Sequence, residues 1–168
     1  MADFYQTGVV ATLHRLRSAN LEQIESELER FARRHRIGLV LPCLFSEFSG
    51  PAIGNIVREL GRVPYLKQIV VSLGRTSADE LPRAKEFFAD LPQTVKFVWN
   101  DGPRVRALYQ LLRDNGLSVG EDGKGRSCWM AYGYLLSNSG CETIALHDCD
   151  ITTYSRELLA RLCYPVVN

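Results

Sequence analysis

The sequence predicts an α/β fold in which a mostly parallel sheet is covered by helices on both faces. Three observations predict it: short apolar runs of strand length recur along the chain, amphipathic segments of helical spacing lie between them, and polar residues follow the runs. Strands that alternate with helices are joined by right-handed crossovers and pair in parallel. Such sheets bind ligands beyond the carboxyl ends of their strands.

The first predicted elements are a helix and a central strand. Apolar residues at helical spacing indicate an amphipathic helix over 20–34, capped by Asn20. The apolar run 37–44 is too short for a helix and is typical of a central parallel strand. Pro51 suits the first turn of a helix, which we expect to reach about Leu60.

The rest of the chain continues the alternation. Further strands are predicted at 67–73, 94–99 and 142–146, and helices at 79–90, 103–115 and 125–137. Pro103 opens one of these helices and Gly116 stops it. The last residues, 162–168, look like the beginning of one more strand. We therefore expect a chain that is cut off soon after Asp150.

Composition limits the class of protein. The chain has 168 residues, 46% of them hydrophobic, and a net charge of +1, which describes one globular domain. The near-neutral net charge argues against electrostatic binding of nucleic acid. No apolar run approaches the roughly 20 residues that are needed to cross a bilayer. Five scattered cysteines without a Cys-x-x-Cys pair fit reduced thiols and argue against structural zinc. We expect a cytoplasmic protein without nucleic-acid or membrane partners.

The most informative motif is Asp148-Cys149-Asp150, which ends an apolar run. Side chains alternate in an extended segment, so we expect both aspartates to project the same way and Cys149 the opposite way. Two carboxylates in one small volume repel each other, and a hard divalent cation such as Mg²⁺ or Mn²⁺ relieves that repulsion. Solvated loop carboxylates or a helix N-cap are the alternatives. The position after a buried strand favours the metal site.

A second motif, residues 122–126, places Lys124 between two glycines immediately before a helix. Backbone N–H groups and the helix dipole favour an anion there, and Lys124 adds a positive charge. The segment is not a Walker motif, because the full Gly-x-x-x-x-Gly-Lys-Ser/Thr pattern is absent. A glycine-rich turn with a solvated lysine is the alternative.

Together these segments resemble the Rossmann-like nucleotide-sugar-binding half of a GT-A glycosyltransferase, over about residues 36–168. The resemblance rests on residues 41–44, 123–125 and 148–150 in that order. Residues 4–8 and 12–16 look like those of the glucosyl-3-phosphoglycerate synthase group and its mannosyl-transferring relatives. The implied organisation is an N-terminal extension and helix over 1–36 and a nucleotide-diphospho-sugar-binding half over 37–168. The domain would be truncated after the Asp-x-Asp motif, without its acceptor half.

The resemblance implies a retaining hexosyltransferase that moves a hexose, with glucose as the first candidate, from a nucleoside-diphosphate sugar to 3-phosphoglycerate or a similar small acceptor. It implies that Asp148 and Asp150 are the catalytic pair and bind a divalent metal, Mg²⁺ or Mn²⁺. Asp150 would ligate the metal directly, and Asp148 would also contact the nucleotide sugar. The other implied nucleotide-sugar contacts are Pro42, Cys43, Leu44, Glu47, Ser72 and Lys124.

Two other function classes stay open. A nucleotidyltransferase on a similar sheet normally carries a glycine-rich loop with a lysine directly after its first strand, and residues 44–50 contain no lysine. A non-catalytic nucleotide-binding domain fits the expected loss of the acceptor half, and for the same reason we expect the chain itself to be an inactive fragment. An open sheet edge would favour self-association, so we expect a homo-oligomer, a dimer first.

Overall fold

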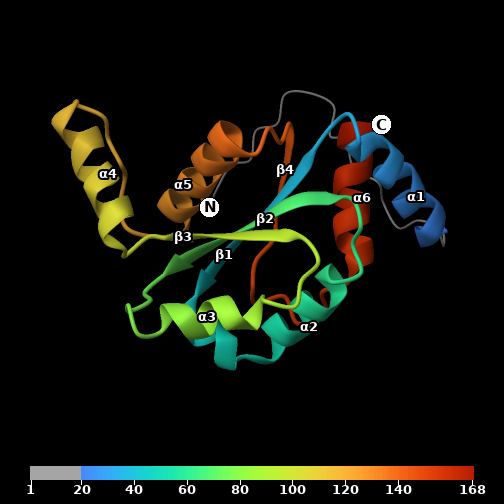
Figure 1. The fold of residues 1–168 in the computed structure, drawn as a ribbon, viewed down its shortest axis with the longest axis horizontal. Helices are drawn as coiled ribbons and strands as arrows, with labels where there is room; N and C mark the ends of the chain where they lie inside the picture. The colour runs from blue at the N-terminus through green and yellow to red at the C-terminus, as the bar shows by residue number, and fades with distance from the viewer. Residues whose placement is uncertain (1–19) are drawn as a thin grey trace, which may run out of the picture.

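The computed structural model describes residues 20–168, which form a four-stranded sheet in the order β3-β2-β1-β4 (Figure 1). Its strands are β1 (Ile37–Leu44), β2 (Leu66–Gly74), β3 (Thr94–Trp99) and β4 (Thr143–Leu146). Each neighbouring pair is parallel. The predicted parallel α/β fold is confirmed. Residues 4–8 and 12–16, which carry part of the predicted resemblance, lie outside the described residues.

Helices cover both faces of the sheet, as predicted (Figure 1). They are α1 (Leu21–Ala32), α2 (Pro51–Leu60), α3 (Leu81–Phe87), α4 (Pro103–Asp114), α5 (Lys124–Asn138) and α6 (Arg156–Val167), and a short 3₁₀ helix, η1 (Phe45–Ser49), follows β1. Side chains of β1 alternate between two cores. Leu39 and Leu41 pack in the larger core with α1, α2, α3 and α6, whereas Val40 packs in the smaller core with α5. None of the described helices is long and apolar enough to cross a membrane.

The order of the strands reverses between β1 and β4. The chain builds β1, β2 and β3 in one direction and then returns through α4 and α5 to place β4 on the free side of β1. In an open parallel sheet, a crevice forms beyond the carboxyl ends of the two strands at such a reversal. The fold therefore predicts a ligand site where β1 and β4 end.

Pro42 lies in the central strand β1 without losing a ladder hydrogen bond. Pairing between β1 and β4 stops at Val40 and Leu146. The carbonyl of Val40 accepts from the amide of His147 at 3.1 Å, and strand backbone groups alternate direction with a period of two. The nitrogen of Pro42 therefore faces the same side, where β4 has already ended. This leaves room for the turn after β4 to approach the end of β1.

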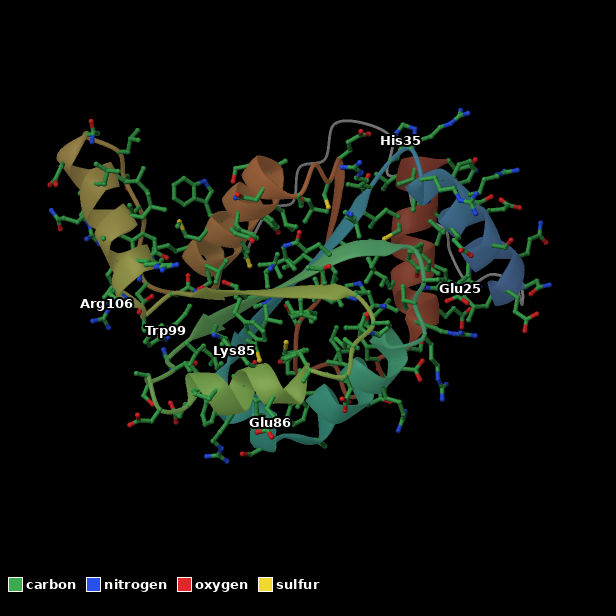
Figure 2. All side chains as sticks on the ribbon, in the orientation of Figure 1. Glu25, His35, Lys85, Glu86, Trp99 and Arg106 are labelled. Atoms are coloured by element: carbon green, nitrogen blue, oxygen red, sulfur yellow. The ribbon has the colours of Figure 1, made fainter. Side chains whose placement is uncertain are left out.

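The prediction that residues 162–168 begin a strand is wrong, because this segment belongs to α6. The buried residues of α6 recur at helical spacing: Leu159, Ala160, Cys163 and Val167. The rings of Phe31 on α1 and Tyr164 on α6 meet edge to face with centroids 6.4 Å apart. Glu25, which Figure 2 labels on α1, lies 3.5 Å from the guanidinium of Arg156. A helix that packs on α1, rather than an unpaired strand, thus occupies this end of the described structure.

Candidate functional site

The predicted site residues gather around one cavity of about 250 Å³ at the carboxyl ends of the strands. The end of β1 and η1 contribute Pro42, Cys43, Leu44 and Glu47, β2 contributes Ser72, α5 contributes Lys124, and the segment after β4 contributes Asp148 and Asp150. The cavity lies at the reversal between β1 and β4. The structure thus brings together all the residues that sequence reasoning selected from four separate segments.

The cavity wall carries more acidic than basic side chains. The acidic ones are Glu47, Asp101, Asp122, Asp148 and Asp150, and the basic ones are Arg75 and Lys124. A diphosphate cannot approach this excess of negative charge closely unless a cation offsets it. Carboxylate oxygens are the ligands that Mg²⁺ and Mn²⁺ prefer, so the donor set fits a hard divalent ion.

Lys124 and Asp148 form an exposed ion pair in this wall. The Nζ of Lys124 lies 2.5 Å from the Oδ1 of Asp148, and their side chains are 56% and 42% exposed. The hydrogen bond to Asp148 raises the pKa of Lys124, so its ammonium group stays charged. Because water screens such a pair, it contributes only about 0–1 kcal/mol to stability. An anionic ligand can therefore draw Lys124 away from Asp148 at small cost.

The N-terminus of α5 adds backbone donors beside Lys124. Gly123 is the N-cap and offers no side chain to the first-turn N–H groups, which have no carbonyl partner inside the helix. These N–H groups and the helix dipole favour an anion. Arg126 is engaged elsewhere: it pairs with Asp122 and lies 4.6 Å from the ring centroid of Tyr109. Lys124 is therefore the cationic side chain of this helix end that lines the cavity.

A turn after β4, rather than the extended segment that we predicted, positions the two aspartates. β4 ends at Leu146, and Cys149 and Asp150 lie in a turn, so alternation along an extended strand does not set their directions. Cys149 is buried in the larger core, whereas Asp150 is exposed. The turn buries its middle residue and leaves both carboxylates in the cavity wall.

His147 supports this turn from the protein interior. Its ring is buried, and Nδ1 lies 3.0 Å from the hydroxyl oxygen of Tyr154. Burial lowers the pKa of His147 to about 4, although the charge of Asp148 opposes the shift. The imidazole is therefore neutral near pH 7 and has a structural partner.

Ser72 belongs to a buried network of polar groups. Its hydroxyl donates to the carbonyl of Ser127 at 2.9 Å and accepts from the amide of Asn100 at 2.9 Å. Asn100 also donates to the carbonyl of Leu73 at 2.9 Å and accepts from the hydroxyl of Tyr109 at 3.1 Å. The network joins β2, the end of β3, α4 and α5. A contact of Ser72 with a nucleobase stays a prediction, since its hydroxyl proton already has a partner in the protein.

Arg75 is a wall residue that the resemblance did not assign to the site. It follows β2, is exposed, and has a φ of 51°, which non-glycine residues seldom adopt. The backbone beside it is held because the amide of Thr76 donates to the carboxylate of Asp101 at 3.0 Å. A lone cation directly after a predicted parallel strand was the available signal.

Cys43 and Glu47 form the inner wall beside Cys149. The amide of Leu44 donates to the Oε2 of Glu47 at 2.8 Å, which folds the carboxylate back over the end of β1. A hydrogen bond with Cys149 and burial raise the pKa of the Cys43 thiol far above its usual range. Cys43 is therefore protonated in the metal-free protein and is not a nucleophile.

No protein-family model matches the chain, but two curated proteins are similar along nearly all of it. It is 49% identical over 168 residues to glucosyl-3-phosphoglycerate synthase of Persephonella marina and covers 42% of that protein. It is 32% identical over 167 residues to glucosyl-3-phosphoglycerate synthase of Methanococcoides burtonii and covers 40% of that protein. These alignments take in 100% and 99% of the chain. The chain thus spans about two fifths of the length of the curated relatives it matches.

Solved structures show the same fold. Glucosyl-3-phosphoglycerate synthase of Mycobacterium tuberculosis, in complex with Mn²⁺, UDP and glucosyl-3-phosphoglycerate, matches 94% of the chain and 47% of its own, with a TM-score of 0.56 and 19% identity. Mannosyl-3-phosphoglycerate synthase of Rubrobacter xylanophilus matches 84% of the chain and 40% of its own, with a TM-score of 0.53 and 22% identity. The predicted resemblance is confirmed: the chain is a homologue of part of the glucosyl-3-phosphoglycerate synthases and has the glycosyltransferase fold of these solved enzymes.

Proposed function

We propose that the chain supplies the nucleotide-sugar- and metal-binding part of a retaining hexosyltransferase that transfers glucose from a nucleoside-diphosphate sugar to 3-phosphoglycerate. The observation that carries the proposal is the gathering of Asp148, Asp150 and Lys124 with the ends of β1 and β2 around one cavity. The names of the two curated relatives support glucose and 3-phosphoglycerate. The Mn²⁺ and UDP in one structural neighbour support a divalent metal and a nucleoside diphosphate.

Asp150 is the proposed direct metal ligand, because it is an exposed carboxylate at the cavity and Lys124 lies against Asp148 instead. Asp148 would complete the metal site and contact the ribose or the sugar. When bound, a divalent ion would offset the negative charge that develops on the departing nucleoside diphosphate. Lys124 and the first-turn N–H groups of α5 would bind the diphosphate from the opposite side.

The nucleobase and ribose have a proposed place against the end of β1. Pro42, Cys43 and Leu44 form an apolar surface there, and Glu47 adds a carboxylate that can accept hydrogen bonds from the ribose hydroxyl groups. Ser72 lies in the part of the wall that β2 contributes. The Ser72 hydroxyl is held by hydrogen bonds to Ser127 and Asn100, so this part of the wall is rigid, which suits a flat nucleobase.

Calorimetry of the purified chain with UDP, GDP and ADP, each with and without Mn²⁺, tests the proposal. We expect binding of at least one diphosphate that depends on the metal and is lost in Asp150→Ala. Asp90→Ala is the matched control, because Asp90 is an exposed carboxylate between α3 and β3 and is not part of the cavity wall. Metal-independent binding, or equal binding by both variants, would contradict the proposal.

Two further readouts separate the alternatives. Preference for a nucleoside triphosphate over its diphosphate would favour a nucleotidyltransferase on a similar sheet. Product analysis of a protein that carries this chain together with an acceptor half, using 3-phosphoglycerate and the UDP, GDP and ADP derivatives of glucose and mannose, identifies the sugar and the base. A cytoplasmic location is also proposed, and it is supported by five cysteines that are all free and buried.

We propose that the protein self-associates, as the sequence led us to expect. Support comes from large apolar side chains exposed on α4 and α5, namely Leu108, Leu111, Trp129 and Leu136. Surface of this kind often marks an interface. Size-exclusion chromatography with light scattering tests the proposal, and a monomer mass at all concentrations would contradict it.

A further inference from the structure

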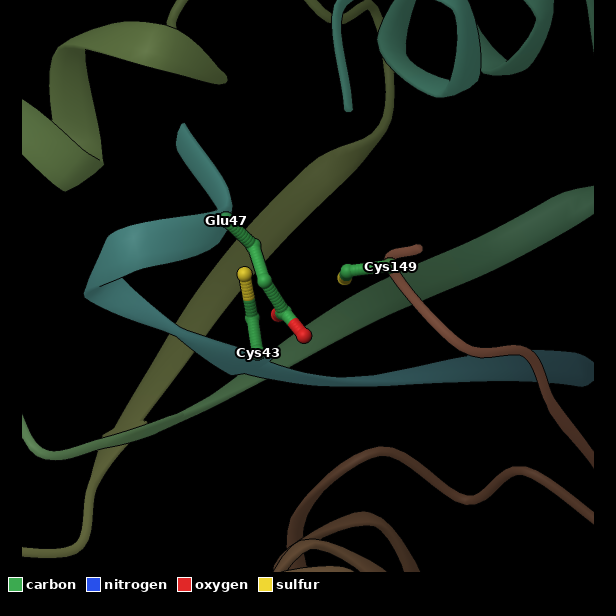
Figure 3. A group of neighbouring side chains, drawn as sticks. All are labelled: Cys43, Glu47 and Cys149. Carbon is green, nitrogen blue, oxygen red and sulfur yellow. The ribbon is translucent and has the colours of Figure 1, made fainter. Parts of the chain in front are cut away.

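Three potential metal ligands converge in the inner wall of the cavity. The sulfur atoms of Cys43 and Cys149 and a carboxylate oxygen of Glu47 all lie within 4.8 Å of one another. Figure 3 shows the carboxylate of Glu47 directed into the space between the two cysteines. The ligands come from β1, η1 and the turn after β4, so no short sequence motif predicts them. The absence of a Cys-x-x-Cys pair therefore does not exclude a sulfur-ligated metal here.

The chemistry of this set differs from that of the aspartate pair. Two cysteine sulfurs and one carboxylate suit Zn²⁺ or Cd²⁺, whereas Mg²⁺ prefers oxygen alone. We propose that Cys43, Glu47 and Cys149 form a binding site for a thiophilic divalent cation of the Zn²⁺ type. The site is distinct from the Asp148 and Asp150 pair, although it shares Cys43 and Glu47 with the wall where the proposed function places the nucleobase and ribose. A cation there is a property beyond the proposed transfer reaction.

The geometry needs little adjustment for such an ion. Zinc–sulfur bonds of about 2.3 Å in a tetrahedral site hold two sulfurs about 3.8 Å apart. Separations of at most 4.8 Å therefore require movements of about 1 Å or less. All three side chains line the cavity, so a water molecule or a ligand atom can occupy a fourth position. Binding replaces the two thiol protons, which pass to solvent, so the metal joins two thiolates and one carboxylate.

The surrounding structure already holds the ligands in place. Cys43 and Cys149 are 3% and 1% exposed, and the Leu44 amide fixes one oxygen of Glu47 at 2.8 Å. Because Cys149 lies between Asp148 and Asp150, an ion in this site would tie their turn to the end of β1. Occupancy would therefore hold both aspartates in one arrangement and raise the melting temperature of the chain.

Titration of the reduced 168-residue chain with Cd²⁺, a spectroscopic probe for Zn²⁺ sites, tests the inference. We expect thiolate-to-cadmium charge-transfer absorption that saturates at one equivalent. It should disappear in Cys43→Ser and in Cys149→Ser, and Glu47→Gln should weaken Cd²⁺ binding by about tenfold or more. Cys163→Ser and Cys128→Ser, which remove buried thiols outside this cluster, should leave it unchanged. Absorption that persists in both Cys43→Ser and Cys149→Ser would overturn the inference.

Two controls separate this result from folding defects and from the proposed transferase function. X-ray absorption of the unmodified chain with one equivalent of Zn²⁺ should report two sulfur ligands and lighter atoms, whereas a sulfur-free shell would overturn the inference. Asp150→Ala should keep the Cd²⁺ signal even though it loses metal-dependent nucleotide binding. Loss of the Cd²⁺ signal in Asp150→Ala would assign the ion to the aspartate site and contradict a separate one.

Discussion

The inner and outer walls of the cavity are built in different ways. In the inner wall, Cys43, Ser72 and Cys149 are at most 3% exposed. In the outer wall, Lys124 and Asp148 face solvent as a screened ion pair. Removing the partner of a buried polar group costs about 1–3 kcal/mol, whereas an exposed pair contributes about 0–1 kcal/mol. The inner wall should therefore contribute more to stability, and the outer wall should contribute mainly to the binding of the diphosphate.

The largest expected effect on stability comes from the pH dependence of His147, behind the inner wall. Its pKa is about 4 in the folded chain against 6.5 for an unperturbed histidine. Below pH 6.5 the unfolded chain binds a proton that the folded chain does not, so the free energy of unfolding falls as pH drops from 6.5 towards 4. The total fall is about 3 kcal/mol, and above pH 6.5 this contribution is constant.

Urea unfolding in metal-free buffer, at several pH values across this window, measures the effect of His147. His147→Gln removes the titrating group, so its free energy of unfolding should fall less steeply over the same pH range. The difference in slope isolates His147 from the carboxylates, which titrate in both proteins. Equal slopes would contradict a lowered pKa of His147 in the folded chain.

The next effect concerns the amide that joins the strands behind the cavity. Asn100→Ala removes hydrogen bonds to Ser72, Leu73 and Tyr109, and we expect a loss of about 2–3 kcal/mol in the free energy of unfolding. Asn115→Ala is the control, since Asn115 is exposed and makes one side-chain bond to its own helix. A comparable loss of stability in both variants would contradict the larger contribution that we assign to the buried network.

The smallest expected effect on stability belongs to the outer wall. Lys124→Met should change the free energy of unfolding by less than about 1 kcal/mol. It should lower the affinity for a nucleoside diphosphate by about tenfold, because a charge beside the phosphates is lost. Lys85→Met is the control, because Figure 2 places Lys85 on α3 and it is not part of the cavity wall. A large fall in the free energy of unfolding of Lys124→Met, together with unchanged affinity for the nucleoside diphosphate, would contradict the proposed roles of the two walls.

Local patterns were sufficient to predict most of the fold. The run at 37–44 is β1 with the bounds that we predicted, because eight consecutive residues without a polar side chain suit a strand covered on both faces. The structure of residues 162–168 was harder to predict. Val166 and Val167 with Pro165 suggest a strand when they are read alone, but the buried spacing of α6 becomes visible only from Leu159 onward. Packing against α1, a tertiary contact, decides the outcome.

The site was predictable where chemistry and topology coincide. Strand ends in a parallel sheet meet at one edge, so Asp148, Asp150 and Ser72 could be placed together from their order in the chain. The turn at Cys149 could not be foreseen, because it depends on where pairing between β1 and β4 stops. The meeting of Cys43, Glu47 and Cys149 likewise depends on side-chain packing between distant segments. The position of Arg75 after a predicted strand could be inferred, whereas its φ of 51° could not.

The most direct test of the central claim is a two-dimensional NMR spectrum of the chain with UDP and a small amount of paramagnetic Mn²⁺. The ion broadens the signals of nearby amides, so it reports where metal and nucleotide bind together. We expect broadening at residues 43–47, 72–75, 122–127 and 148–150, and little change along α1 and α3. The broadening should disappear in Asp150→Ala. Broadening centred elsewhere, or unchanged in that variant, would contradict a metal and nucleotide site where β1 and β4 end.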